Sequence, residues 1–481
     1  MPLIKDLKPR RSDRNLIIGL TCNYATNFKL ILFIIFLLFS TFLAFLHFIP
    51  SSYFISSSCL PDPDPDPNPL THQLPTTDRI LENGATKRYF YPFGSGAYSF
   101  IFMSAYRGGL NSFAIVGLSS KPLHLYSRPT YTCEYKTQND TVLTKTSRIL
   151  PDWGFGRIYT VLIINCTFPH GTHNPSNGGQ LLLHIPSPVN PNLTDTIIAL
   201  TEKPFSWDPS NFLSPPKFEF LYCGSPLYGN LSPQRMREWI AYHVRLFGKK
   251  SHFAIYDAGG VHKEVMEVLK PWMDLGYISI HDVKEEERFD GYYHNQFLIV
   301  NDCLHRYRFE TEWMFFFDVD EYIYVQNGKS IRSMVDLVRD YTQFEIEQIP
   351  ISNQICLAED DGETSKKWAM EKLVYRNVKK VARRDRKYAI QPRNVLATGV
   401  HLSKNFFGES APKTEKLIKY FHYHGTIVER RDTCKHFLNR TKSTKLGDVP
   451  FVLETSMRPL ARLVKKFELE TIGSKLESTK L

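Results

Sequence analysis

The most apolar segment of the chain runs from Leu30 to Ile49 and contains no Asp, Glu, Lys or Arg. As a helix, a segment of about 20 residues is long enough to cross the hydrocarbon core of a bilayer. Basic residues precede it and no small-residue cleavage site follows it, which favours a retained anchor over a removable signal peptide. We therefore predict a cytosolic tail at 1–29, a transmembrane signal anchor at 30–49 and a lumenal remainder, which describes a single-pass type II membrane protein.

The lumenal part begins with a polar, proline-rich pattern that predicts a stem at 50–85. Within it, Pro61–Pro69 alternates proline with aspartate and asparagine, which favours an extended polyproline spacer. Residues 86–205 are rich in Tyr, Thr, Ser and Gly, and their short apolar runs, such as Ser112–Gly117 and Ile158–Ile164, lack a helical period. This pattern predicts a small β-sandwich.

From residue 206 to residue 460 the pattern changes to strands that alternate with helices. The predicted strands are Phe218–Cys223, His252–Tyr256, Tyr277–His281 and Phe315–Asp318. The predicted helices are Ser232–Phe247, with Ser232 as N-cap and Pro233 at N1, Lys263–Leu269 and Tyr293–His305. Such a succession predicts an α/β domain with a mostly parallel sheet. We expect a C-terminal tail at 461–481.

Two carboxylates follow the most apolar of these strands. The run Trp313–Phe317 ends at Asp318, and Asp320 comes two residues later. Acids at the end of a buried parallel strand emerge at the edge where α/β sheets bind ligands, and together they can hold a divalent cation and the phosphates of a substrate. The alternative is a pair of solvated strand-end acids. Other Asp-x-Asp triplets occur only in the stem, between Asp62 and Asp66.

Charge and compartment restrict the partners. The formal net charge of +10 includes basic residues of the cytosolic tail. Because the chain is anchored to a membrane, nucleic acid is not expected, and the basic excess fits an anionic ligand or an acidic, pectin-like matrix.

Cysteines and glycosylation sequons agree with an oxidising lumen. The sequons begin at Asn139, Asn165, Asn192, Asn230 and Asn439. No Cys-x-x-Cys spacing indicates zinc. Cys22 falls in the cytosolic tail and Cys59 in the stem, where it is free to link two chains in a homodimer.

Several ordered blocks resemble glycosyltransferase family 92. They are Leu221–Asn230, Asn301–Arg306, Phe316–Tyr322 and Tyr420–Gly425, and Asp385–Pro392 is similar to the plant galactan synthases of that family. The resemblance covers most of Thr86–Glu454. It implies a GT-A fold behind a carbohydrate-binding β domain, a Golgi location, UDP-galactose as donor, β-1,4-galactan as acceptor, Mn²⁺ and inversion at the anomeric carbon.

This resemblance assigns roles to particular residues. His422 and His424 alternate on one face of a predicted strand and join Asp318 and Asp320 as expected metal ligands, unless they serve a core or the acceptor sugar. Expected nucleotide contacts are Tyr256, Asp257, His294, Asn295 and Arg306, although Asp257 is equally suited to cap a helix. An inverting transfer needs a base; we expect Glu371 in preference to Asp361, and each has the alternative of a solvated or ion-paired acid. The basic run that includes Arg383, Arg384, Arg386 and Lys387 is expected to hold diphosphate or acidic glycan, or to be a solvated face.

The remaining cysteines are paired by domain. We expect Cys133–Cys166 in the β domain and Cys223–Cys303 and Cys356–Cys434 in the catalytic domain. Three alternatives to a galactosyltransferase stay open at this point: a transferase with another UDP-sugar donor, a non-catalytic glycan-binding or scaffold protein on a transferase-like fold, and a glycoside hydrolase, which would need paired carboxylates but no nucleotide.

Overall fold

The computed structural model describes residues 71–73, 78–94, 98–121, 129–187, 194–289, 291, 294–378, 385–428 and 431–476, with Phe33, Phe36 and Leu38. The chain divides into two units, 1–68 and 69–481, and all elements below belong to the second. None of the helices in this described part is long and apolar enough to span a membrane. The predicted anchor at 30–49 lies outside the described residues except at the three positions named.

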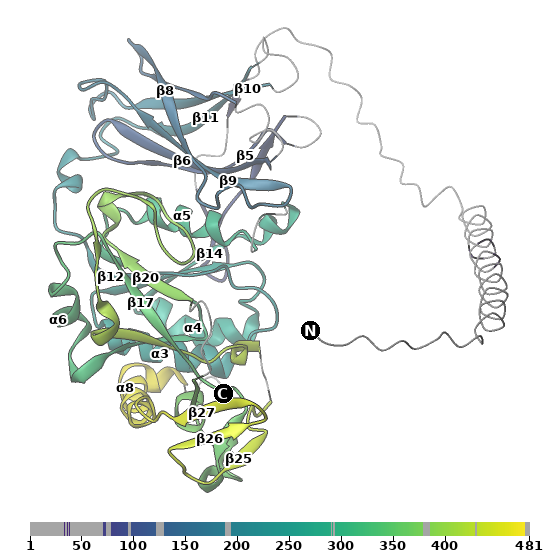
Figure 1. Cartoon of the computed structure of the whole chain (residues 1–481). Helices are drawn as coiled ribbons and strands as arrows, with labels where there is room; N and C mark the ends of the chain where they lie inside the picture. Colours follow the sequence, from purple (N-terminus) through teal and green to yellow (C-terminus); the bar gives the residue numbers. More distant parts are fainter. Residues whose placement is uncertain are drawn as a thin grey trace, which may run out of the picture. The chain divides into compact units, whose positions relative to one another are not determined.

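The N-terminal β domain is built on a nine-stranded sheet, which forms the upper part of the molecule in Figure 1. In order across the sheet, its strands are β1 (Thr71–Gln73), β11 (Thr194–Glu202), β10 (Gly179–Pro186), β7 (Thr132–Lys136), β8 (Thr141–Ile149), β9 (Tyr159–Thr167), β6 (Ser112–Ser120), β5 (Phe100–Arg107) and β4 (Tyr91–Phe93). The first half of β8 pairs with β7 and its second half with β9, so the ladder folds back into two layers.

The two layers enclose their own core, and one of them is buried on both faces. Leu162 and Ile164 of β9 face Leu181 and Ile197 of the opposite layer. The alternate side chains of β9, such as Val161, pack instead against a helix of the next domain. This two-sided burial explains why β9 is almost continuously apolar in the sequence.

The larger sheet of the molecule has eleven strands and is mixed. Its main path is β16 (Glu321–Val325), β24 (Ile418–His422), β17 (Gln343–Pro350), β20 (Arg386–Ile390), β15 (Thr311–Phe316), β12 (Phe218–Cys223), β13 (Ser251–Asp257), β14 (Ile278–Asp282), β3 (Thr86–Lys87) and β2 (Arg79–Ile80), with β23 (Ser410–Ala411) beside β17. The pairs formed by β15, β12, β13, β14 and β3 are parallel, whereas β20 and β16 run antiparallel to their neighbours. The predicted parallel pairing is confirmed for β15, β12, β13 and β14, whereas the other half of the sheet mixes parallel and antiparallel pairs.

Helices cover both faces of this sheet. They are α3 (Pro233–Phe247), α4 (Lys263–Asp274), α5 (Gln296–Arg306), α6 (Ile331–Asp336), α7 (Ala369–Lys372) and α8 (Arg458–Leu476). Trp239 of α3 and Trp272 of α4 pack on one face. On the other face α5 lies between the two sheets, as Figure 1 shows, and contacts β5, β6 and β9.

Smaller sheets complete the C-terminal region: β18 (Ile355–Leu357) with β25 (His436–Leu438), β19 (Tyr375–Asn377) with β27 (Val449–Leu453) and β26 (Ser443–Leu446), and β21 (Val395–Ala397) with β22 (Asn405–Phe406).

Two segments lie where the sequence pattern did not place them. Residues 79–87, expected mostly in the stem, form the β2–β3 hairpin at the edge of the larger sheet. Residues 461–476, expected in a tail, belong to α8, whose Ala461 and Val464 are buried and whose Glu468 accepts hydrogen bonds from Arg237 of α3. In both cases a short or charged segment is ordered by contacts with distant parts of the chain.

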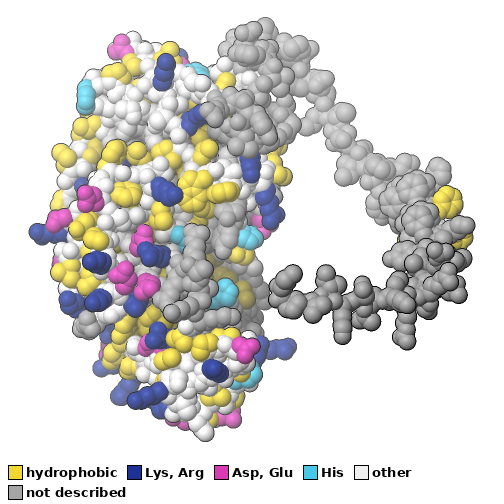
Figure 2. Space-filling model, in the orientation of Figure 1, with side chains coloured by type: hydrophobic (Ala, Val, Ile, Leu, Met, Phe, Trp, Pro, Cys, Tyr) yellow, Lys and Arg dark blue, Asp and Glu magenta, His cyan; other side chains and the backbone are white. Residues whose placement is uncertain are grey.

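The surface does not present one sign of charge. On the face shown in Figure 2, Lys and Arg are interspersed with Asp and Glu. The net positive charge is therefore not gathered into a continuous basic surface on that face.

Candidate functional site

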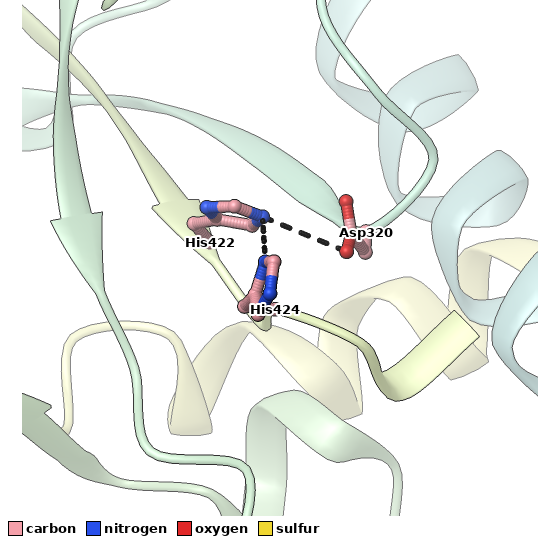
Figure 3. Close-up of side chains that lie close together, drawn as sticks. All are labelled: Asp320, His422 and His424. Carbon is pink, nitrogen blue, oxygen red and sulfur yellow. Dashed lines mark hydrogen bonds and ion pairs between the residues drawn. The ribbon is translucent and has the colours of Figure 1, made fainter. Parts of the chain in front are cut away.

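Three side chains that can ligate a metal converge beside the end of β24. Asp320, His422 and His424 each offer one ligand atom, and these atoms lie within 4.8 Å of one another (Figure 3). His422 Nε2 is 3.5 Å from Asp320 Oδ2, and His424 Nδ1 is 3.4 Å from His422 Nε2. The strand expected to reach His424 ends at His422, and His424 lies in the following turn. The intervening Tyr423 is buried, and both imidazoles still come to one side, as expected.

The backbone and a neighbouring amide fix this group. The Tyr423 N–H donates to the carbonyl of Asp320 at 3.0 Å, and the Gly425 N–H donates to Asp320 Oδ2 at 3.2 Å. Gln348 Nε2 lies 2.5 Å from His422 Nδ1, which orients the ring and leaves Nε2 toward Asp320. Partners of this kind, which hold a ligand without touching the metal, are typical of metal sites.

Asp318 is not part of this group, although it was predicted as a ligand. Its carboxylate accepts a hydrogen bond from Ser225 and forms an ion pair with Lys387 at 2.6 Å. Gln296 Nε2 approaches the same carboxylate at 3.5 Å. The turn after β15 thus sends the two acids of the Asp-x-Asp motif to different partners, and Lys387 already neutralises the first.

Burial and charge compete around Lys387. Burial raises the pKa of Asp318, but Lys387 and the hydrogen bonds from Lys387 and Ser225 outweigh burial and hold that pKa below its ordinary value. Burial also raises the pKa of Glu321, to about 7, with Lys387 opposing the rise. Burial lowers the pKa of Lys387, yet the charges of Asp318 and Glu321 raise it above the ordinary lysine value. The ammonium therefore stays charged next to the site.

His422 is under similar competition. Burial lowers its pKa, whereas the hydrogen bond to Asp320 and the charges of Glu321 and Asp320 raise it, and the net pKa lies above the ordinary histidine value. The same negative surroundings that attract a proton attract a metal cation.

An open cavity of about 260 Å³ adjoins these residues. Asp318, Asp320, His422 and His424 line it together with Ser225, Tyr222 and Tyr228, and its other walls are Pro226, Leu227, Leu231, Val319, Ile427 and Val428. The cavity lies beyond the carboxyl ends of β12 and β15, where ligand sites of parallel sheets are expected.

The expected nucleotide residues separate into two groups. Tyr256 and Arg306 do not line the cavity: the Tyr256 hydroxyl donates to Asp302 Oδ2 at 2.7 Å, and Arg306 contacts Asp302 and Asp78. They belong to a buried network in which Asp302 also accepts from Arg88, Ser104 and Tyr106, so they join the two domains.

Asp257 is a structural residue as well. It accepts the N–H groups of Gly259 and Val261 in the loop before α4 and pairs with Lys284, whereas the N-cap of α4 is His262, so Asp257 is not the helix cap of the alternative. His294, by contrast, stacks on Tyr228 at the cavity, and Asn295 is buried immediately beside it.

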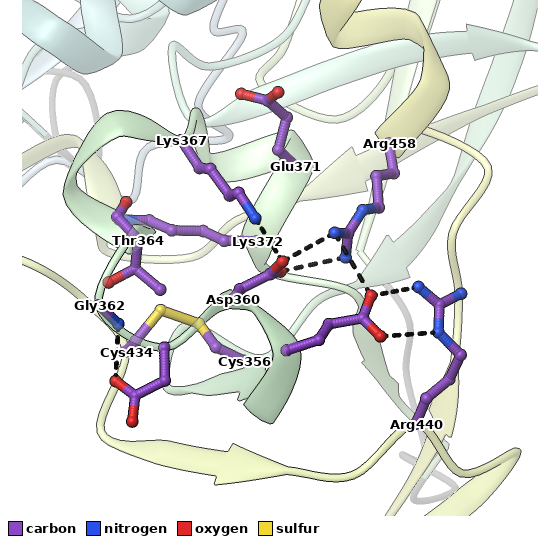
Figure 4. A network of polar contacts seen from close by, with 12 residues as sticks. Cys356, Asp360, Gly362, Thr364, Lys367, Glu371, Lys372, Cys434, Arg440 and Arg458 are labelled. Atoms are coloured by element: carbon purple, nitrogen blue, oxygen red, sulfur yellow. Dashed lines mark hydrogen bonds and ion pairs between the residues drawn. A yellow bond between two sulfur atoms is a disulfide. The ribbon is translucent and has the colours of Figure 1, made fainter.

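Neither expected base is among the residues that line the cavity. Figure 4 shows the polar network in which Glu371 and Asp360 lie. Glu371 Oε2 accepts the Trp368 N–H at 2.7 Å at the start of α7 and pairs with Lys465 of α8. Asp361 is exposed and accepts the Gly362 N–H. Asp360, which precedes Asp361, is buried and pairs with Lys367 and Arg458. Glu371 and Asp360 are thus engaged by cations, whereas the carboxylate of Asp361 accepts a backbone N–H of the adjacent residue.

Disulfides join Cys133 to Cys166, Cys223 to Cys303 and Cys356 to Cys434, which confirms the three expected pairs. Asn139, Asn230 and Asn439 are exposed, whereas Asn165 is half-buried and its Nδ2 is buried. Asn192, Arg383 and Arg384 lie outside the described residues. Arg386 pairs with Glu345, so of this basic run only Lys387 contacts a cavity residue among the described positions.

Sequence reasoning missed Tyr222, Ser225 and Tyr228. Their signal was present, because they follow or end β12, the central parallel strand, and residues after such a strand meet the ligand edge of the sheet.

Residues 218–458 match the glycosyltransferase family 92 profile, so the fold and site just described are those of a glycosyltransferase-family protein. The chain belongs to glycosyltransferase family 92. It is 48% identical over 505 residues to the galactan beta-1,4-galactosyltransferase GALS3 of Arabidopsis thaliana, with 100% of both chains covered. It is also 48% identical over 520 residues to GALS2, with 99% of this chain and 100% of GALS2 covered, and 44% identical over 396 residues to GALS1, with 82% and 80% covered; both bear the same enzyme name and come from the same plant.

Proposed function

We propose that this chain transfers galactose from UDP-galactose to β-1,4-galactan chains of pectin, with a divalent cation and with inversion at the anomeric carbon. The observation that carries the proposal is the convergence of Asp320, His422 and His424 at an open cavity of a family 92 domain. The relatives' names supply the sugar and the acceptor. The acids at the carboxyl ends of parallel strands support a GT-A fold.

The three side chains suit Mn²⁺, because one carboxylate and two imidazoles combine the oxygen and nitrogen ligands that this ion accepts. When bound, the cation supplies positive charge against the diphosphate of the departing nucleotide. For Nε2 of His422 to be a ligand, its proton must sit on Nδ1. Gln348 then serves as acceptor through Oε1, which a rotation of its amide brings to the position now held by Nε2.

Lys387 and Ser225 act on the other side of the site. Lys387 is 3% exposed, and its ion pair with Asp318 holds that carboxylate in one position and balances its charge. A carboxylate balanced before the reaction does not oppose the negative charge that develops on the leaving group. We assign no proton transfer to Glu371 or Asp361, since both have partners away from the cavity.

The N-terminal β domain is proposed to bind the acceptor glycan, and the anchor at 30–49 to hold the enzyme in the Golgi membrane with its catalytic domain in the lumen. The β domain also covers α5: Val116 and Val161 share a core with Leu298. Removal of residues 86–205 would therefore expose apolar surface of the catalytic domain, and acceptor binding is better tested by point substitutions than by deletion.

The test is transfer of galactose to β-1,4-galactan oligosaccharides, measured by mass of the products, with and without EDTA. Asp320→Asn should lower turnover at least 100-fold, about the effect of losing a transition-state charge contact. Asp340→Asn, at an acid that is 90% exposed on the surface, is the matched control and should have no effect. Full activity in EDTA would refute the metal, and UDP release only with UDP-glucose or UDP-arabinopyranose would replace the donor. Absence of UDP release from every donor would support the scaffold alternative.

A further inference from the structure

We propose that Tyr228 and His294 form a stacking platform for the uracil ring of the donor nucleotide. This assignment rests on the proposed function, because it takes the donor to be a uridine diphosphate sugar. It adds a base-recognition site to the cavity, at two residues on different segments of the chain.

The two rings lie face to face at the cavity. Tyr228 is a lining residue and is 45% exposed. Its ring centroid is 4.2 Å from that of His294, with 23° between the planes. One face of the tyrosine is thus covered by the imidazole, and this contact holds the phenol ring in one orientation.

The backbone beneath Tyr228 is clamped to the end of β13. The Leu227 N–H donates to the Tyr256 carbonyl at 2.7 Å, and the Leu227 carbonyl accepts from Ala258 and Gly260 at 2.8 and 2.9 Å. Gly260 allows this approach, since a Cβ there would lie 2.7 Å from the Tyr228 nitrogen. The platform therefore stands on rigid backbone and is formed before a ligand arrives.

His294 is held by an unusual backbone. Its φ is 53° and that of Asn295 is 54°, both in the left-handed region that non-glycine residues rarely adopt. Buried Asn295 fixes the pair by donating to the carbonyls of Phe289 and Glu286. Gly291 has no room for a Cβ, which would fall 1.6 Å from Asn295 Oδ1. Conformations of this kind persist where the surrounding structure over-determines them, and they cluster at ligand sites.

The chemistry of the cavity favours a base over a sugar ring at this place. The lining residues near Tyr228 in sequence, Pro226, Leu227 and Leu231, offer no side-chain hydrogen bonds, and neither do Ile427 and Val428. A galactose ring would leave hydroxyls unpaired against such walls, whereas the faces of uracil are apolar. The proposed metal ligands at the same cavity would hold the diphosphate of the same molecule.

The experiment is calorimetric titration of UDP, with Mn²⁺ present, into the full-length protein in detergent and into its variants. Tyr228→Leu should weaken UDP binding about tenfold or more, the usual loss when a base loses its aromatic partner. Tyr228→Phe should bind within about threefold of wild type, since the ring face remains. Phe155→Leu, at an exposed aromatic residue that does not line the cavity, is the matched control and should bind as wild type does.

A second pair of ligands tests the ring contact itself. 5,6-Dihydro-UDP, whose base is not planar, should bind the wild type more weakly than UDP but should bind Tyr228→Leu about as well as UDP does. Inorganic pyrophosphate with Mn²⁺ should bind both proteins alike.

The outcomes separate the platform from the function. UDP binding that is equal in wild type and Tyr228→Leu overturns the platform and leaves the galactosyltransferase intact. Loss of galactan-oligosaccharide binding in Tyr228→Leu with UDP binding retained assigns the ring to the acceptor and also overturns it. A wild-type protein that binds pyrophosphate with Mn²⁺ but shows no preference for UDP refutes the uridine donor, and the platform with it.

Discussion

Gln348→Leu tests whether the histidine site is built to hold a metal. Gln348 lies on β17, where its register partner is Tyr420, and its amide is 2.5 Å from Nδ1 of His422. Leucine keeps the approximate size of the side chain and removes both the donor and the acceptor. None of the three proposed ligands is altered.

The magnitude follows from the role of the amide. A metal-bound His422 needs its proton on Nδ1, and Gln348 is the group placed to accept it. Loss of such an outer contact typically lowers metal affinity 10- to 100-fold, which corresponds to about 1.4 to 2.7 kcal/mol. His422 itself remains 17% exposed and supported by Asp320, so the fold should survive.

The assay is titration of Mn²⁺ into the protein, followed by the electron paramagnetic resonance signal of the free ion. The control is Glu347→Gln on the same strand, because adjacent strand residues point to opposite faces and Glu347 pairs with Lys419 instead. An unchanged Mn²⁺ affinity in Gln348→Leu would refute this reasoning, as would an equal loss in Glu347→Gln.

Three further predictions concern other parts of the chain. Glycopeptide mapping should find glycans at Asn139, Asn230 and Asn439 but none at Asn165, because its Nδ2 is enclosed in the folded domain; a glycan at Asn165 would contradict the packing of β9. Tyr222→Phe should leave the unfolding free energy unchanged or higher, because its buried hydroxyl has no hydrogen-bond partner among the described residues, whereas Tyr242→Phe loses a bond to the Ile323 carbonyl and should cost about 1–3 kcal/mol by chemical denaturation. Burial lowers the pKa of His243 to about 3, so the folded state stays neutral while the unfolded state gains a proton below about pH 6.5. This contribution is fully present above that pH and is lost as the pH falls, so the stability deficit of His243→Gln relative to wild type should shrink by about 1.4 kcal/mol per unit between pH 6 and pH 5; a deficit independent of pH would contradict it.

The central strands and helices were readable from sequence because they are local patterns with strong burial. Phe218–Cys223 was predicted with the bounds of β12, and the helix predicted at Ser232–Phe247 is α3, which begins at Pro233 with Ser232 as the N-cap residue. The parallel half of the sheet followed from their order. The other half, in which parallel and antiparallel pairs are mixed, did not, since β16, β17, β20 and β24 are brought together by contacts that no local pattern records.

The site was only partly readable for the same reason. Alternation along one strand put His422 and His424 on one face, which is a local property. Asp318, Glu371 and Arg306 each pair with a residue far away in the sequence. The partners are Lys387, Lys465 and Asp78, at separations of 69, 94 and 228 positions. The sequence around an acidic residue does not indicate whether that residue forms an ion pair with a distant basic residue.

The division of the Asp-x-Asp motif shows how this matters for the chemistry. In the extended strand Asp318 and Asp320 would face the same way, and two carboxylates on one cation would leave little positive charge for a diphosphate. The turn after β15 separates them: Asp318 N–H donates to Glu321 Oε2 at 2.7 Å, and the carboxylate of Asp318 is neutralised by Lys387. Asp320 is then the single acid beside the two imidazoles. With the proposed cation bound, one carboxylate would leave it a net positive charge, whereas the charge of Lys387 is already balanced by Asp318. The cation of the proposed function would therefore keep positive charge near the position where a departing nucleotide would gain negative charge.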